Sequence, residues 1–340
     1  MRMGSSHLHL SAGVSTRTFG SLSSAESAAA ASAPVPLLTQ YVAIWLESIE
    51  GLVRRGTVEA YARRLELHVL PRLGDRRLDQ IGVDDVAKLI ADLRRRGYAG
   101  STISCVLVPL SRLLGHAVRR GLIEDNPVRK LDRTERPRIE RRERPVLNRD
   151  EIGRLLEAAP PAHRTLLATA ILSGLRQSEL LGLHWGDIDF AREVIHVRRA
   201  LDRQRREAPP KTPHAVRDVV LMPALAQALL ERRDESQFRD LDDYVFTTRT
   251  GTPLHSSKVS PQALRPALKK AGLPPIRWHD LRHTFASLLI AGGANITFVS
   301  RQLGHSSSQI TLQVYAHLLD RDEQAQRTRA MLEEMLGSVV

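Results

Sequence analysis

The stretch HDLRHTFASLL occupies residues 279–289 and carries the most informative pattern in the chain. If it is helical, His279, Arg282 and His283 lie on one face, because residues three and four positions apart are neighbours on a helix. Such a face fits a pair of structural histidines, a metal site or an anion site. A zincin-type zinc site needs a glutamate directly after the first histidine, where this chain has Asp280. Arg282 favours an anion, because a guanidinium repels a metal ion and donates two hydrogen bonds to a phosphate.

Two earlier motifs contain candidate basic residues. In SGLRQSELLGL at 173–183, Arg176 follows a glycine break between two helical patterns, and Glu179 lies three residues on, within reach of the guanidinium. In PPKTPHAVRDVVL at 209–221, Lys211 stands just before a predicted strand. A lone arginine or lysine is ordinarily a solvated surface residue, so these motifs carry weight only in combination.

Two motifs near the end of the chain add a histidine and a tyrosine. LGH at 303–305 and VYAHLL at 314–319 place His305 and Tyr315 ten residues apart within a predicted helical region. A tyrosine in an apolar helix is ordinarily part of a core, so this pair also gains meaning only from its companions.

Taken together, the motifs GLRxSEL, KTxxxxR, HxLRHT and LGH, followed by a tyrosine, resemble those of the tyrosine recombinase family, the phage-type integrases. The resemblance covers residues 148–320. Residues 37–127 are more loosely similar to the family's helical core-binding domain.

The resemblance implies a metal-free and ATP-free cleavage of DNA, because the bond energy stays in a 3′-phosphotyrosyl link. It implies that two arginines bind the non-bridging oxygens, a lysine protonates the leaving 5′-oxygen, and one histidine exchanges a proton with the tyrosine. A second histidine donates to a phosphate oxygen. The residues in these catalytic roles are Tyr315, Arg176 with Arg282, Lys211, His279 and His305. Glu179 is expected to orient other groups without reacting, and His283 to support packing or the buried network rather than to contact DNA. Neither a metal nor a cofactor is expected.

Composition is consistent with an anionic partner. The 340 residues suggest about two domains, and 50 Lys and Arg against 38 Asp and Glu give a net charge of +12. Nucleic acid, an anionic membrane surface and an acidic protein all attract that charge. The single cysteine, Cys105, indicates a reducing compartment. No uninterrupted apolar run of membrane-spanning length is seen, so a soluble protein is expected.

The patterning predicts a mainly α fold with a small antiparallel sheet, an α+β arrangement of two domains. Apolar residues spaced three and four apart predict a helical bundle over 37–128, after an Ala/Ser-rich disordered tail at 1–36. A basic linker over 129–147 leads to the catalytic domain, 148–340. Within that domain, alternation around 186–221 predicts the sheet. An amphipathic C-terminal helix at 322–336 either packs on its own domain or docks on a neighbouring protomer.

The positive charge is partly local. Residues 129–145 hold 8 basic and 4 acidic groups in 17 positions, and a second basic run follows Val197. Each run is either a solvated connector or a DNA contact, and the resemblance favours DNA, since the family's two domains clamp a duplex. The candidate DNA-binding residues are Arg136, Arg138, Arg141, Arg142, Arg144, Arg198, Arg199 and Arg217.

The sequence therefore predicts a site-specific recombinase of the integrase type. The resemblance implies that it acts on double-stranded DNA as a homotetramer at the synapse, is a monomer in free solution, and works in the cytoplasm at the nucleoid, with accessory DNA-bending or directionality proteins. Alternatives within the family are a dimer-resolving Xer-like enzyme and a transposon recombinase. Outside it, the alternatives are a non-cleaving DNA-binding protein and a metal-dependent hydrolase, which the lack of a carboxylate cluster near the histidines disfavours.

Overall fold

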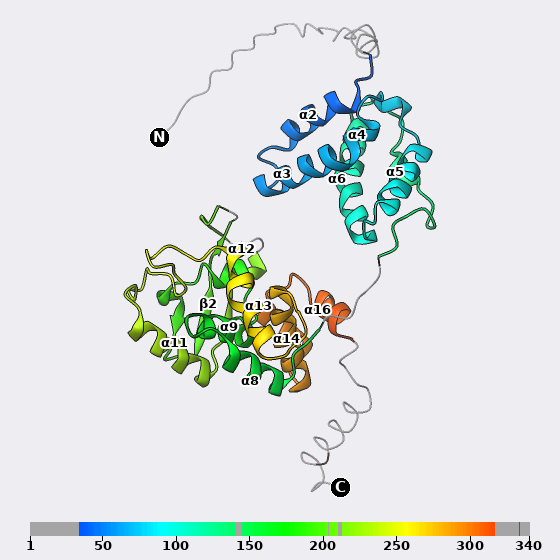
Figure 1. The fold of residues 1–340 in the computed structure, drawn as a ribbon. Helices are drawn as coiled ribbons and strands as arrows, with labels where there is room; N and C mark the ends of the chain where they lie inside the picture. The colour runs from blue at the N-terminus through cyan, green and yellow to red at the C-terminus, as the bar shows by residue number, and fades with distance from the viewer. Residues whose placement is uncertain (1–33, 140–144, 203, 210–212, 317–332, 334–340) are drawn as a thin grey trace, which may run out of the picture. The chain divides into compact units, whose positions relative to one another are not determined.

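The computed structural model describes residues 34–139, 145–202, 204–209, 213–316 and 333. These residues divide into two compact units, with the boundary between Arg141 and Arg142. Both units are mainly helical, and among the described residues the strands all belong to the second unit (Figure 1). The predicted α+β class is therefore confirmed.

The first unit is a small bundle around α6, which buries eight side chains at helical spacing, from Ile103 to Ala117. Leu65 and Val69, in a π-helical turn that continues α3 into α4, are fully buried in the same core. The predicted helices of this region are all present. The helices of this unit are α2 (Leu38–Ile49), α3 (Arg55–Arg64), α4 (Leu70–Leu73), α5 (Val83–Arg95), α6 (Gly100–Arg119) and α7 (Pro127–Lys130).

Helix α6 is also the one helix in the described part of the chain that is long and apolar enough, by length and composition, to cross a membrane. Half of its most apolar stretch is buried within the protein. The helix contains no uninterrupted apolar run of membrane-spanning length, because Arg112 lies within it. Its apolar face packs against α3, α5 and α7, which is the environment of a core helix.

The predicted linker, 129–147, is packed onto the units at both ends. Leu131 is only 4% exposed and belongs to the first core, and Leu147 is 2% exposed and belongs to the second. The backbone N–H of Leu147 also donates to Thr284 Oγ1 at 3.2 Å. The sequence did not predict the burial of these two leucines, because charged residues dominate the segment. Residues 140–144 lie outside the described residues.

The second unit combines a layer of helices with two small antiparallel sheets. In the three-stranded sheet, of order β1-β2-β5, Ile195 pairs with Val219, and both side chains are fully buried. This is the sheet predicted from the alternating pattern. The strands are β1 (Ile188–Asp189), β2 (Val194–Val197), β3 (Ala200–Leu201), β4 (Glu207–Ala208) and β5 (Arg217–Val220). The β3–β4 hairpin was not predicted, because charged residues dominate the connection between its strands.

Helix α9 packs against α14 and α11 in this unit (Figure 1). A smaller apolar cluster joins α14, α15 and α16 through Phe285, Leu303 and Tyr315, among others. The predicted C-terminal helix, 322–336, lies outside the described residues except for Glu333. The helices of the second unit are α8 (Arg149–Ala158), α9 (Pro161–Ser173), α10 (Gln177–Leu180), α11 (Pro223–Glu235), α12 (Ser256–Val259), α13 (Arg265–Lys270), α14 (Trp278–Ala291), α15 (Ile296–Leu303) and α16 (Ser308–Tyr315).

Candidate functional site

A sharp turn between α9 and α10 positions Arg176. Gly174 ends α9 in the left-handed conformation, at φ 59°, and a Cβ at this position would overlap the ring of Phe285. Only glycine fits such a position without strain. The chain then turns back, and Arg176 caps the short helix α10.

Glu179 binds two arginines at once. Its Oε1 accepts from Arg176 Nη1 at 2.7 Å, as their spacing predicts, and its Oε2 accepts from Arg217 Nη2 at 3.0 Å. Oε2 also accepts from the backbone N–H of Arg176 at 2.9 Å. The side chains of Glu179 and Arg217 are 3% and 5% exposed, whereas Arg176 is 35% exposed. Burial by itself would raise the pKa of Glu179, but the two guanidinium groups outweigh it and hold that pKa below its ordinary value.

Three arginines converge on the end of α15. The last carbonyls of a helix have no partner within the helix and form the negative end of its dipole, so cations are favoured there. Here the arginines come from the N-cap of α10, from β5 and from α14, and they donate to three successive carbonyls. The contacts are Arg217 Nε to Gln302 O at 2.6 Å, Arg282 Nη2 to Leu303 O, and Arg176 Nη2 to Gly304 O at 2.9 Å.

Arg282 is buried at 4% exposure, in the interior of the unit. Its Nη1 donates to Gly174 O at 2.7 Å, so it ties the α9–α10 turn to the end of α15. Burial, followed by repulsion from Arg176 and Arg217, lowers the pKa of Arg282 to about 9. The group stays protonated at neutral pH, and the cluster keeps its positive charge.

His305 lies in the turn between α15 and α16, rather than inside a helix. Gly304 ends α15 at φ 61°, and His305 Nδ1 then lies 2.8 Å from Thr311 Oγ1. Burial, and next the charges of Arg282 and Arg176, lower the pKa of His305 to about 4. This imidazole is therefore neutral at neutral pH.

Tyr315 is the last residue of α16, and its side chain is buried at 3% exposure. Its hydroxyl lies 2.5 Å from His283 Nδ1. The ring of His279 packs edge-to-face on His283 with the ring centroids 4.9 Å apart, and His279 itself is exposed. The family resemblance pairs Tyr315 with His279, whereas the hydrogen bond seen here pairs it with His283. Helical spacing alone did not distinguish the two histidines.

The remaining predicted residues are placed differently. Lys211 lies outside the described residues. Arg217, predicted to contact DNA, is instead buried, and Nε, Nη1 and Nη2 each donate to a protein acceptor. A usable signal was present, because Arg217 precedes the buried Val219 by two residues and period-two alternation puts both on one face.

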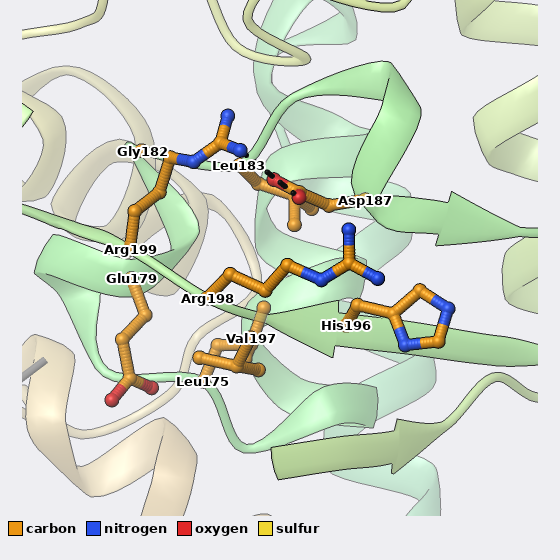
Figure 2. A pocket seen from close by; sticks show the side chains of 9 residues that line it. All are labelled: Leu175, Glu179, Gly182, Leu183, Asp187, His196, Val197, Arg198 and Arg199. Carbon is orange, nitrogen blue, oxygen red and sulfur yellow. Dashed lines mark ion pairs between the residues drawn. The ribbon is translucent and has the colours of Figure 1, made fainter. Parts of the chain in front are cut away.

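Arg198 and Arg199 line a small pocket beside β2 (Figure 2). Arg199 Nη2 lies 3.4 Å from Asp187 Oδ1 and its Nε lies 3.8 Å from Glu207 Oε2, while the neighbouring Arg198 is exposed. Figure 2 shows the carboxylate of Glu179 pointing away from the Arg199–Asp187 pair. Glu179 therefore lines the same pocket as Arg198 and Arg199, but its carboxylate bonds Arg176 and Arg217.

The predicted linker arginines fall into two groups. Arg136 and Arg138 are exposed, although Arg136 Nε and Nη2 also donate to backbone carbonyls of Leu131 and Arg129. Arg141, Arg142 and Arg144 lie outside the described residues.

The site brings together three arginines, one carboxylate, two histidines of α14, His305 and a tyrosine hydroxyl. Three cationic groups against one carboxylate favour an anionic ligand, and a buried hydroxyl bonded to an imidazole is a candidate nucleophile. Within the described ranges, no three His, Cys, Asp or Glu side chains gather as potential metal ligands.

Comparison with known families gives two matches. Residues 145–322 match the model of the Phage integrase family, and residues 37–94 match the Phage integrase, N-terminal SAM-like domain. The first match spans more than half of the chain and contains the whole site.

Curated relatives carry related names. A Tyrosine recombinase XerC-like protein of Caldanaerobacter subterraneus is 30% identical over 68% of this chain and 66% of its own length. Prophage integrase IntR of Escherichia coli is 29% identical over 70% of this chain and 63% of its own length. The ICEBs1 integrase of Bacillus subtilis is 30% identical over 67% of this chain and 66% of its own length. The chain thus spans slightly less than two thirds of the length of these relatives.

Solved structures share the fold. The Tn1549 transposon integrase in complex with a circular intermediate DNA matches with a TM-score of 0.75 at 22% identity, over 87% of this chain and 99% of that one. A lambda integrase dimer bound to a core site matches with a TM-score of 0.66 at 20% identity, over 87% and 81%. On the family match, which covers the arginine cluster and the tyrosine alike, this chain belongs to the phage integrase family, the tyrosine recombinases.

Proposed function

We propose that the protein breaks and rejoins DNA strands at a specific site through a covalent 3′-phosphotyrosyl intermediate. The observation that carries the proposal is the convergence of Arg176 and Arg282 on the end of α15, together with the Tyr315 hydroxyl held by His283 on the helix that carries Arg282, within the segment that matches the family. The names of the relatives, recombinases and integrases, support the same activity.

The reaction balances without an added group. The Tyr315 oxygen bonds to the scissile phosphorus, the bond from phosphorus to the 5′-oxygen breaks, and the tyrosine proton passes to an imidazole. The departing 5′-oxygen takes up a proton, for which we propose Lys211 as donor. Attack of a second 5′-hydroxyl on the phosphotyrosine reverses these steps and joins new partners.

The arginines supply the countercharge for the phosphate. Each Nη nitrogen carries two protons, and in Arg176 and Arg282 the hydrogen bonds to Glu179 and to carbonyls hold the planar guanidinium in place. A fixed planar fork suits the charge that develops on two non-bridging oxygens. His305, neutral at neutral pH, donates a hydrogen bond to a phosphate oxygen.

We propose that His283 holds the Tyr315 hydroxyl for attack, while His279, exposed at the start of α14, takes part in proton transfer once DNA is bound. The short His283–Tyr315 contact supports the first role, and the family resemblance supports the second. Replacing His283 with Ala is then expected to slow strand cleavage at saturating DNA. If only the His279→Ala variant is slow, His283 has no part in the step.

The test of the activity uses covalent capture of DNA. The full chain is incubated in EDTA with a pool of nicked duplexes that carry a randomised site, and duplexes trapped in SDS-resistant adducts are recovered and amplified. We expect a selected duplex that forms an adduct with the unaltered protein and none with Tyr315→Phe. Tyr244→Phe is the matched control, because Tyr244 bonds Glu207 outside the cluster, and it should still form the adduct. An adduct that persists in Tyr315→Phe rules the mechanism out.

We further propose a division of labour along the chain. Residues 37–128 form a DNA-binding domain, 148–340 a catalytic domain, and the basic residues of 129–147 contact the duplex between them. The family matches at 37–94 and 145–322 support this division. Residues 322–336 are proposed to form a helix that packs on its own domain or on a neighbouring protomer, and residues 1–36 a tail without chemistry.

The proposed assembly is a monomer in free solution and a homotetramer on paired sites, working in the cytoplasm with accessory DNA-bending proteins. A solved lambda integrase tetramer bound to a Holliday junction, which shares the fold, supports the tetramer. Sedimentation of the protein with and without the selected duplex tests this assembly. It is contradicted if the protein remains a monomer when two duplexes that carry the site are present.

The biological role is proposed to be integration or excision of a mobile element. Relatives named as prophage and element integrases support this, and relatives named XerC favour dimer resolution as the second candidate. Two plasmid assays separate them. An integrase joins two different sites on separate molecules, whereas a resolving enzyme acts on two copies of one site.

A further inference from the structure

We infer that Arg217 is a positioning residue whose buried guanidinium neutralises Glu179 and so leaves the positive charge of Arg176 available to an anion. The inference rests on the proposed function for the identity of that anion, a DNA phosphate. Nothing about Arg217 in the sequence motif alone required this, because an arginine next to a predicted strand is equally suited to touch DNA.

The geometry of Arg217 leaves it no surface role. Its side chain is 5% exposed, and its three nitrogens donate to Glu179 Oε2 at 3.0 Å, Gln302 O at 2.6 Å and Ala215 O at 3.1 Å. One guanidinium thus joins α10, the end of α15 and the turn that precedes β5. Gly304 allows this approach, because a Cβ there would lie 3.0 Å from Arg217 Nη1.

The charges explain why a second arginine is needed. Arg176 alone with Glu179 would form a neutral pair, and a phosphate approaching Arg176 would meet a carboxylate 2.7 Å behind it. With Arg217 included, the trio carries a net charge of +1. Because Arg217 is buried and Arg176 is 35% exposed, the accessible part of that charge lies at Arg176.

Arg282 offers an internal comparison. Its hydrogen bonds within the described part of the chain go to the carbonyls of Gly174 and Leu303, so dipoles rather than a carboxylate hold it in place. Carbonyl dipoles orient the charge of Arg282 without cancelling it. Arg176 is held by a carboxylate, and Arg217 compensates for that carboxylate.

A merely structural ion pair makes a different prediction, and a double-variant cycle separates the two. Arg217→Met leaves Glu179 to cancel Arg176. Combining Arg217→Met with Glu179→Gln removes both charges of the buried pair, and the new amide oxygen can still accept a hydrogen bond from Arg176. Replacing both members of a buried pair is ordinarily tolerated by the fold. If charge is what matters, the second change restores activity that the first removes.

The measurements are the rate of adduct formation on the selected duplex at saturating protein, the affinity for that duplex, and the thermal unfolding curve. We expect Arg217→Met to slow adduct formation roughly 10- to 100-fold, less than the roughly 10²- to 10³-fold lost with a direct transition-state donor. Adding Glu179→Gln should then raise the rate again about fivefold or more, and Arg217→Lys should retain part of the rate, because it keeps the charge without the fork. Arg232→Met is the matched control, since Arg232 also donates to a carbonyl, Val245 O, but outside the cluster.

The outcomes are distinct. If the double variant recovers thermal stability but not the rate of adduct formation, Arg217 is only structural and the inference fails. Losses of rate that multiply in the double variant also contradict the inference. If Arg217→Met does not fold, the neutral Arg217→Gln takes its place in the cycle, with the same rescue expected. If the unaltered protein traps no duplex, or if the Tyr315→Phe variant still traps one, the proposed function is contradicted. If Arg217→Met traps the duplex at the unaltered rate, only this inference is contradicted.

Discussion

Each unit of the molecule buries a carboxylate among arginines, but the arginines of the two clusters lie differently. In the first unit the side chain of Asp92 is 8% exposed, and the three arginines that pair with it reach in from the surface, with 47–71% of each side chain exposed. The pairs are Arg72 at 2.5 Å, Arg95 at 3.3 Å and Arg96 at 3.9 Å.

In the second unit one partner of Glu179 is itself buried. The side chain of Arg217 is 5% exposed, whereas the side chains of the arginines around Asp92 are 47–71% exposed. An exposed ion pair contributes about 0–1 kcal/mol, but removing one partner of a buried pair is destabilising by about 3–5 kcal/mol. The same residue types thus tie helices together in one unit and hold a fixed charge in the other.

The largest effect is expected from deleting the two carboxylates. Glu179→Ala strands the buried Arg217 and should lower the free energy of unfolding of the second unit by about 3–5 kcal/mol. Asp92→Ala releases surface arginines to water and should lower that of the first unit by about 1 kcal/mol. Calorimetry of the full chain, following the transition of each unit, measures both, and equal losses would remove the distinction between the clusters.

The buried cluster also depends on backbone shape, which a pair of glycine variants tests. Gly174 and Gly272 both follow a helix with φ near 60°, at 59° and 65°, but a Cβ meets the Phe285 ring at the first and nothing within 4 Å at the second. Gly272→Ala should then be destabilising by about 1–2 kcal/mol from backbone strain alone. Gly174→Ala should add about 1–3 kcal/mol from overpacking, and it should displace the carbonyl that Arg282 binds. Thermal unfolding and adduct formation record the two effects, and identical behaviour of the variants would contradict the packing argument.

The two clusters should respond differently to acid, because each has a neighbouring histidine with a lowered pKa. The pKa of His305 is lowered from 6.5 to about 4, so below pH 6.5 the unfolded chain binds a proton that the folded chain takes up only near pH 4. The stability of the second unit should therefore fall as the pH drops through this window. We expect a loss of about 1–2 kcal/mol by pH 4, discounted because the side chain is only half-buried.

The matched variants are His305→Gln and, in the first unit, His68→Gln. The pKa of His68 is also lowered, by burial and then by Arg96. Only one arginine, which is partly exposed, acts on His68. The His68→Gln variant should therefore change the pH dependence of stability less than His305→Gln does. Unfolding curves between pH 4 and 7 that stay parallel for the unaltered protein and His305→Gln would show that folding does not lower the pKa of His305.

The smallest effect is expected on DNA affinity, from a comparison of the exposed Arg198 with the ion-paired Arg199. Arg198 is exposed, whereas Arg199 is held by Asp187 and Glu207. Arg198→Gln should reduce the slope of log affinity for the selected duplex against log salt by about 1, as for one lost phosphate contact. Arg199→Gln should change it less and mainly lower the melting temperature. A larger change in slope for Arg199→Gln would reverse the assignment.

Much of the fold followed from local patterns. The stretch at 279–289 is helical and lies within α14, and the alternation around 186–221 includes strand β2. Both follow from apolar spacing, which nearby residues enforce. The sequence did not predict the β3–β4 hairpin or the burial of Leu131 and Leu147, because charged neighbours outnumber the apolar residues that determine them.

By itself, the sequence determined the order of the motifs, the family and the spacing that joins Arg176 to Glu179, since each depends on residues near in the chain. Only the tertiary structure decided which basic residues are buried and which histidine meets Tyr315. Arg282 bonds Gly174 across 108 residues, and Arg176 bonds Gly304 across 128. Burial and charge compensation arise from such distant contacts, so a buried arginine such as Arg217 and an exposed one such as Arg198 look alike until the chain is folded.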